Sequence, residues 1–154
     1  MNVDNVVAGD ILFFVSSGSI FDKFISYWTR SRFVHVAIAI GDGQKIEAVG
    51  QGVIHSPVTD ATAAIWHPPA GTYDHLPAAL AWLEKQVGNP YGWGDIVDAI
   101  DTSHTFYYVQ AGHTDCSVLA SEFLELAGYS FPPDLLLNLH TITPAMLANT
   151  LGVK

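Results

Sequence analysis

A tight turn between two β-rich segments constrains the fold of this chain more than any other part of its sequence. The segments FVHVAIAI (residues 33–40) and KIEAV (residues 45–49) are separated by Gly41-Asp42-Gly43. A short Asp-Gly turn between two such segments is a strong local signal for a β-hairpin. We therefore expect an antiparallel sheet that contains this hairpin, with its two strands paired about the turn centre at residue 42.

Further strands are predicted in the first half of the chain, and helices mainly in the second. The other β-rich apolar segments cover residues 11–15, 52–55 and 63–66. Apolar residues at helical spacing, together with capping residues, predict helices over residues 19–30, 76–87, 93–100, 116–127 and 143–150. Residues 101–114 are predicted to form a loop. Strands followed by helices, in a chain of this length, predict a single α+β domain over residues 1–154.

Composition and charge exclude several classes of protein. Of the 154 residues, 49% are hydrophobic and 14% are charged, which excludes a disordered chain. Six basic and fifteen acidic residues give a net charge of −9, so nucleic acid and anionic membrane surfaces are not expected as partners. No apolar run reaches the roughly 18–20 residues of a membrane span, and the first residues lack the features of a signal peptide. We expect a product that is cytoplasmic as synthesised, with later export or delivery by a phage left open.

The cysteine and histidine content argues against a metal centre. The single cysteine excludes an intramolecular disulfide and any cysteine-rich metal site. The seven histidines show no His-x-His or His-x-x-x-His spacing, and no glycine-rich phosphate-binding loop is present. We therefore expect neither a metal nor a cofactor.

The single cysteine, Cys116, is a candidate nucleophile. It follows Asp115, the predicted N-cap of a helix, and so lies in the first helical turn. The free N–H groups and the positive end of the helix dipole at this position favour a thiolate over a thiol. A small buried hydrophobic residue is the alternative interpretation. His55 and His113 are further candidates for a site around this sulfur.

His35 and Glu47 are the candidate general base and its orienting partner. His35 lies within an otherwise apolar strand, and in the predicted register residue 35 faces residue 49. Glu47 then lies diagonal to His35, within reach of a long side chain. A carboxylate at this place would fix the tautomer of His35 and stabilise the imidazolium that forms when a thiol is deprotonated. A core histidine and a solvated strand glutamate are the alternatives.

Four segments of the chain together resemble a known family. They are GDILFF, HVAIAIGDGQKIEAVGQGV, GNPYGWGD and DCSVLASEFLELAG, and they extend from Gly9 to Gly128. These segments resemble the papain-like cysteine hydrolases of the NlpC type, a superfamily rich in bacterial cell-wall endopeptidases. In ordinary members the tyrosine and cysteine segments precede the histidine hairpin. Here the order is reversed, which is similar to the circularly permuted, YiiX-like branch.

The resemblance implies a fold and a set of roles. The implied fold is a circularly permuted papain-like domain, in which a barrel-like antiparallel sheet packs against helices. Cys116 would be the nucleophile of a thiol peptidase or amidase, His35 its base, and Glu47 the third polar residue, where ordinary members often have a second histidine. Tyr91 falls where the family places an oxyanion-stabilising hydroxyl, with the Cys116 N–H as the other donor. The stretch between Tyr91 and Cys116 is longer than in ordinary members, and an aromatic loop anchor is the alternative role for Tyr91.

Three functions are compatible with this resemblance. The first is hydrolysis of an amide bond in a small peptide or N-acyl substrate, above all a peptidoglycan peptide of the cell wall. The acidic charge of the chain suggests that such a substrate carries a free amino group. The second is a lipid acyl hydrolase or acyltransferase resembling the lecithin:retinol acyltransferase branch, which has a second histidine where Glu47 stands and an NCEHF-like nucleophile motif. The third is a catalytically silent binding module on the same fold.

Overall fold

A computed structural model of the chain describes residues 5–15, 32–90, 115–136 and 142–154. The helices predicted over residues 19–30 and 93–100, and the loop predicted over 101–114, lie outside these ranges. Tyr91 and His113 also lie outside them.

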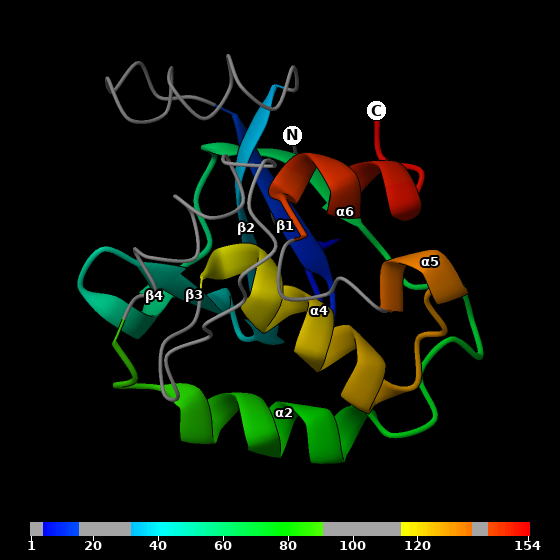
Figure 1. Ribbon diagram of the computed structural model, residues 1–154. Coiled ribbons are helices and arrows are strands. Elements are labelled where there is room, and N and C mark those ends of the chain that lie inside the picture. Colours follow the sequence, from blue (N-terminus) through cyan, green and yellow to red (C-terminus); the bar gives the residue numbers. More distant parts are fainter. Residues whose placement is uncertain (1–4, 16–31, 91–114, 137–141) are drawn as a thin grey trace.

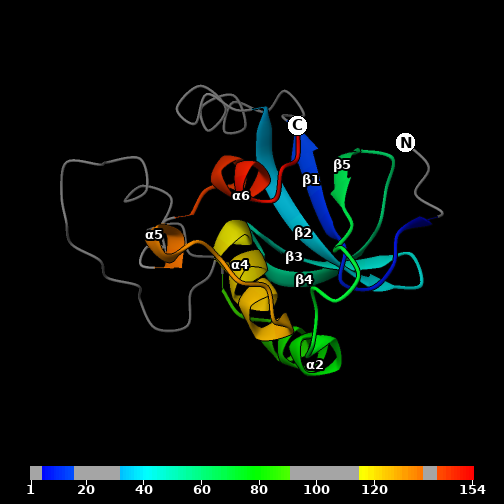
Figure 2. The same cartoon turned by 90° about the vertical axis from the view of Figure 1, so that its right-hand side faces the viewer.

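Five antiparallel strands form one sheet in the order β4-β3-β2-β1-β5 (Figures 1 and 2). Their bounds agree with the strands expected from sequence to within two residues: β1 Ile11–Val15, β2 Phe33–Gly41, β3 Gln44–Val49, β4 Gly52–Pro57 and β5 Thr62–Trp66. The described sheet is open, with β4 and β5 at its two edges. The expected barrel-like sheet was therefore wrong, because β5 pairs with β1 instead of closing onto β4.

The hairpin between β2 and β3 has the predicted turn and register. Asp42 and Gly43 both have positive φ, 51° and 69°, as a type I′ turn requires. The pairs Ile38–Ile46 and Ala39–Lys45 confirm pairing about residue 42. In the described sheet this ladder runs no further than Ile38–Ile46, and the two strands continue without pairing to each other.

The helices of the second half pack on one face of the sheet. Figures 1 and 2 place α4 and α6 against this face, with α2 beside α4. The shared core contains Phe13 of β1, Ile38 of β2, and Phe123 of α4. The bounds are α2 Leu76–Gln86, α4 Cys116–Ala127, α5 Pro133–Leu136 and α6 Pro144–Thr150. The four-residue α5 was not predicted, and no described helix is both long and apolar enough to cross a membrane.

Local capping signals fix both ends of α4, as the sequence predicts. The Oδ1 atom of Asp115 accepts hydrogen bonds from the N–H groups of Ser117 and Val118, both at 2.8 Å. Gly128 ends the helix with a φ of 111°, which glycine adopts without steric penalty. Because the N-cap is Asp115, the helix begins at Cys116, and its first residue lies close to the sheet.

Candidate active site

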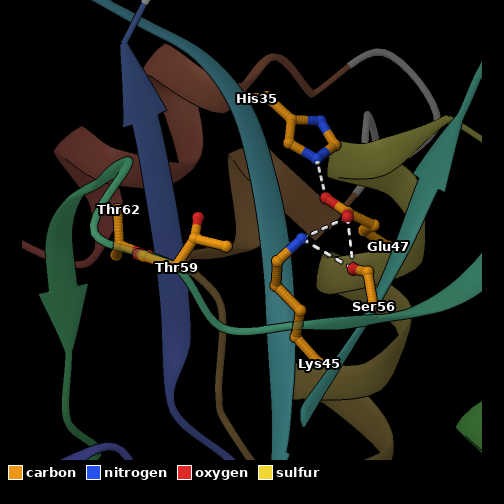
Figure 3. A network of polar contacts seen from close by, with 6 residues as sticks. All are labelled: His35, Lys45, Glu47, Ser56, Thr59 and Thr62. Carbon is orange, nitrogen blue, oxygen red and sulfur yellow. Dashed lines mark hydrogen bonds and ion pairs between the residues drawn. The ribbon is translucent and has the colours of Figure 1, made fainter. Parts of the chain in front are cut away.

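His35 of β2 and Glu47 of β3 form a partly buried polar pair. The Nε2 atom of His35 lies 2.7 Å from Oε2 of Glu47 (Figure 3). The two side chains are 23% and 11% exposed. This is the diagonal contact expected from the hairpin register, and it lies just beyond the last paired residues of the ladder, Ile38 and Ile46.

Cys116 joins this pair from a third element. It is the first residue of α4, a helix that contacts both β2 and β3, and its side chain is buried. The side chain of Cys116 lies near enough to His35 to raise the pKa of the imidazole. Because Nε2 of His35 contacts Glu47, Nδ1 is the ring nitrogen that remains available to a further partner. A histidine that interacts with a thiol and is oriented by a carboxylate is the arrangement needed to activate a nucleophile.

The electrostatics of the site favour a protonated His35. Burial alone would lower the pKa of His35, because a buried imidazolium loses its hydration. Interactions with Cys116 oppose this effect most strongly, and those with Glu47 follow. Together they raise the pKa of His35 from 6.5 to about 9. At neutral pH the site therefore holds an imidazolium that interacts with Cys116 and with the carboxylate of Glu47.

Glu47 is held as a carboxylate. Burial favours its neutral form and would raise its pKa. Hydrogen bonds from His35, Lys45 and Ser56 act in the opposite direction and lower the pKa of Glu47 from 4.5 to about 2. The carboxylate can therefore orient His35 over the whole neutral and mildly acidic range.

Sequence reasoning missed three residues around this pair. Lys45 and Ser56 both contact Oε1 of Glu47, and Nζ of Lys45 lies 2.8 Å from Oγ of Ser56 (Figure 3). The ring of Phe14 lies 5.4 Å from the His35 ring and 5.2 Å from Nζ of Lys45, measured to the Phe14 centroid. Strand alternation was the signal that could have found Lys45, since residues 45 and 47 lie on one face of β3.

His55, a candidate from sequence, does not join the site. It pairs with Ile46 across β3 and β4, so it lies on the opposite face from Glu47. Its Nε2 atom lies instead 2.9 Å from Oε2 of Glu84 on α2, at the surface. Among the residues that the structure describes, no three histidine, cysteine, aspartate or glutamate side chains are grouped so as to hold a metal ion.

Comparison of the chain with models of known protein families and with curated proteins gives no match. The chemical interpretation of the site accordingly rests on its residues and their geometry.

Proposed function

We propose that the chain is a papain-like cysteine hydrolase that cleaves an amide bond. One observation carries this proposal: His35 contacts Glu47 and interacts with Cys116, and the three residues come from three separate elements. A histidine that is raised in pKa by a thiolate and oriented by a carboxylate is the activating arrangement of a cysteine nucleophile.

The burial of these charges supports a catalytic role over a binding module. Desolvating charged groups is unfavourable, and well-packed apolar side chains often stabilise a fold as well or better. Perturbed pKa values in a cluster of this kind are concentrated at functional sites. A module that only binds a ligand would have no need for an imidazolium and a carboxylate behind a buried sulfur.

The roles of the three residues follow from their order. The Cys116 thiolate attacks the amide carbonyl carbon and an oxyanion forms. In this proposal the N–H of Cys116 and the hydroxyl of Tyr91 stabilise the oxyanion. His35 then donates its proton to the leaving amine, which departs and leaves a thioester on the sulfur. A water molecule, deprotonated by His35, attacks the thioester and releases the acid and the thiolate. Glu47 keeps the imidazole in one orientation throughout.

The helix cap limits which backbone donors can serve the oxyanion. The side chain of Asp115 accepts hydrogen bonds from the N–H groups of Ser117 and Val118. The N–H of Leu119 donates to the carbonyl of Asp115. Within this first turn, we therefore assign the N–H of Cys116 as the backbone donor that stabilises the oxyanion.

We assign the fold to the circularly permuted, NlpC-type branch of the papain-like hydrolases. Support comes from the order of the segments along the chain, with the histidine hairpin before the nucleophile helix, and from the packing of that helix on an antiparallel sheet. The nucleophile segment DCSVLASEF departs from the NCEHF-like motif of the lecithin:retinol acyltransferase branch, and this departure favours the NlpC-type branch. The proposed substrate is a peptide of the peptidoglycan type with a free amino group, which suits a chain of net charge −9.

Turnover of defined substrates tests this proposal. Purified parent protein and Cys116→Ser would be incubated with peptidoglycan stem peptides and, separately, with acyl esters, and the released amine or acid would be measured. We expect amine release from the stem peptides by the parent alone, with a KM that rises with salt. Ester cleavage without amide cleavage would favour the lipid function. Equal activity in both proteins would contradict the role of Cys116, and binding without cleavage would favour a silent module.

A further inference from the structure

Lys45 is an unusual residue in its surroundings. Its side chain is only 6% exposed, whereas lysine is almost never fully buried unless it is paired. The ammonium group contacts Oε1 of Glu47 and the hydroxyl of Ser56, and it lies over the face of the Phe14 ring. Because of these contacts, the ammonium of Lys45 lies beside Glu47, inside the molecule and not in solvent.

In the proposed reactive state, in which Cys116 is a thiolate, groups of opposite charge follow one another from α4 to β3. Their order is the sulfur of Cys116, the imidazolium of His35, the carboxylate of Glu47 and the ammonium of Lys45. Without Lys45 the first three groups would leave one uncompensated negative charge in a partly buried place. An unpaired buried charge is strongly unfavourable and is usually relieved by proton uptake.

The two oxygens of Glu47 are used separately. Oε2 contacts His35, while Oε1 accepts hydrogen bonds from Lys45 and Ser56. Lys45 and Ser56 are direct partners across β3 and β4, so the sheet itself fixes their spacing. A carboxylate held at one oxygen by two donors cannot rotate without losing both of them. Its other oxygen is thereby fixed toward the imidazole.

We propose that Lys45 and Ser56 are positioning residues that hold Glu47 ionised and aimed at His35, and thereby keep Cys116 reactive. This inference rests on the proposed function and adds two residues to it. The groups that act directly on Glu47 are His35 of β2, Lys45 of its own strand and the neutral Ser56 of β4. Cys116 of α4 acts on Glu47 through His35.

Four variants and two readouts test the proposal. The ¹³C shift of the Glu47 carboxyl would be followed from pH 2 to pH 6, and the rate of Cys116 alkylation by iodoacetamide would be measured at pH 6. In Lys45→Met we expect Glu47 to titrate about one pH unit higher or more, the shift expected for loss of a charge-assisted hydrogen bond. We expect alkylation to be about tenfold slower. Ser56→Ala should change both readouts in the same direction by less.

Glu84→Gln is the matched control, because it removes a carboxylate that contacts a histidine on the far face of the sheet. It should match the parent in both readouts. Should Lys45→Met fail to fold, Ser56→Ala decides the question, since it removes a single oxygen. An unshifted Glu47 titration, or a shifted titration with unchanged alkylation, would overturn the positioning role.

His35→Gln separates this proposal from the one on which it rests. Equal alkylation of the parent and His35→Gln, together with a shifted Glu47 titration in Lys45→Met, would overturn the proposed function. Slow alkylation of His35→Gln, together with an unshifted titration in Lys45→Met, would overturn the positioning role alone.

Discussion

Two of the histidine–carboxylate pairs among the described residues have similar geometry and different surroundings. His35 and Glu47 approach to 2.7 Å, and His55 and Glu84 to 2.9 Å. The first pair is 23% and 11% exposed, and the second is 43% and 49% exposed. The first carboxylate also contacts Lys45 and Ser56, and the first imidazole also contacts Cys116 and Phe14.

The comparison teaches that distance alone does not define a catalytic pair. An exposed ion pair is screened by water and salt and contributes between zero and about 1 kcal/mol. A buried pair with further partners fixes both the protonation state and the orientation of its members. In this site it raises the pKa of His35 to about 9 and lowers that of Glu47 to about 2.

Replacing the histidine of the buried pair should have the largest effect. His35→Gln keeps much of the side-chain volume and removes both the base and the cation beside Cys116. Because general acid–base catalysis contributes about 10²–10⁴-fold, we expect kcat/KM to fall by roughly a thousandfold. Initial rates on the best amide substrate would measure this. A variant within threefold of the parent would exclude His35 as the base.

Replacing the carboxylate of the buried pair should have the next largest effect. Glu47→Gln keeps the shape of the side chain, removes its charge and leaves Lys45 and His35 uncompensated. We expect kcat to fall about ten- to a hundredfold with little change in KM, since orientation matters most in the transition state. We also expect the free energy of unfolding to fall by about 3 kcal/mol or more. Steady-state kinetics and urea unfolding would show both, and an unchanged kcat would assign the orienting role elsewhere.

The pH dependence of stability should have two limbs that come from the buried pair. The lowered pKa of Glu47 adds stability that is complete above pH 4.5 and is lost as the pH falls through about 2. The raised pKa of His35 adds stability that is complete below pH 6.5 and is lost as the pH rises through about 9. We therefore expect the sum of these two contributions to be largest between about pH 4.5 and 6.5.

Urea unfolding of the parent at pH 3, 5.5 and 9.5 would measure these limbs. His35→Gln should flatten the alkaline limb, and Glu47→Gln should flatten the acid limb. A parent protein that is equally stable at pH 3 and pH 5.5 would contradict the electrostatics of Glu47.

Breaking the exposed pair should have the smallest effect. We expect Glu84→Gln to change the free energy of unfolding by less than about 0.5 kcal/mol and to leave turnover unchanged, because its charge is screened by solvent. Urea unfolding and steady-state kinetics would measure these two quantities. A loss comparable to that of Glu47→Gln would mean that burial does not distinguish the two histidines.

The features that sequence predicted well are those fixed by neighbouring residues. Asp42 and Gly43 adopt the positive φ angles of the turn, which sets the register that brings Glu47 to His35. Asp115 and Gly128 are local caps, so both ends of the helix that carries Cys116 were predictable. These signals act within a few residues and do not depend on the rest of the fold.

The features that sequence missed depend on contacts between distant segments. The barrel-like closure was wrong because the pairing of β5 with β1, about fifty residues away, leaves no local signal. Lys45 in a strand suggests a solvated side chain, and only its pairing with Ser56 and the approach of Phe14 make it part of the site. His55 was a candidate from its place on the next strand, but alternation puts it on the other face.

The most direct test of the account is the pH dependence of Cys116 alkylation by iodoacetamide in the parent and in His35→Gln. An ordinary thiol, with a pKa of about 8.5, is less than about 1% ionised at pH 6. We expect the parent to be alkylated at least about tenfold faster than His35→Gln at pH 6. Rates that coincide in the two proteins at every pH would contradict the catalytic pairing of Cys116 with His35.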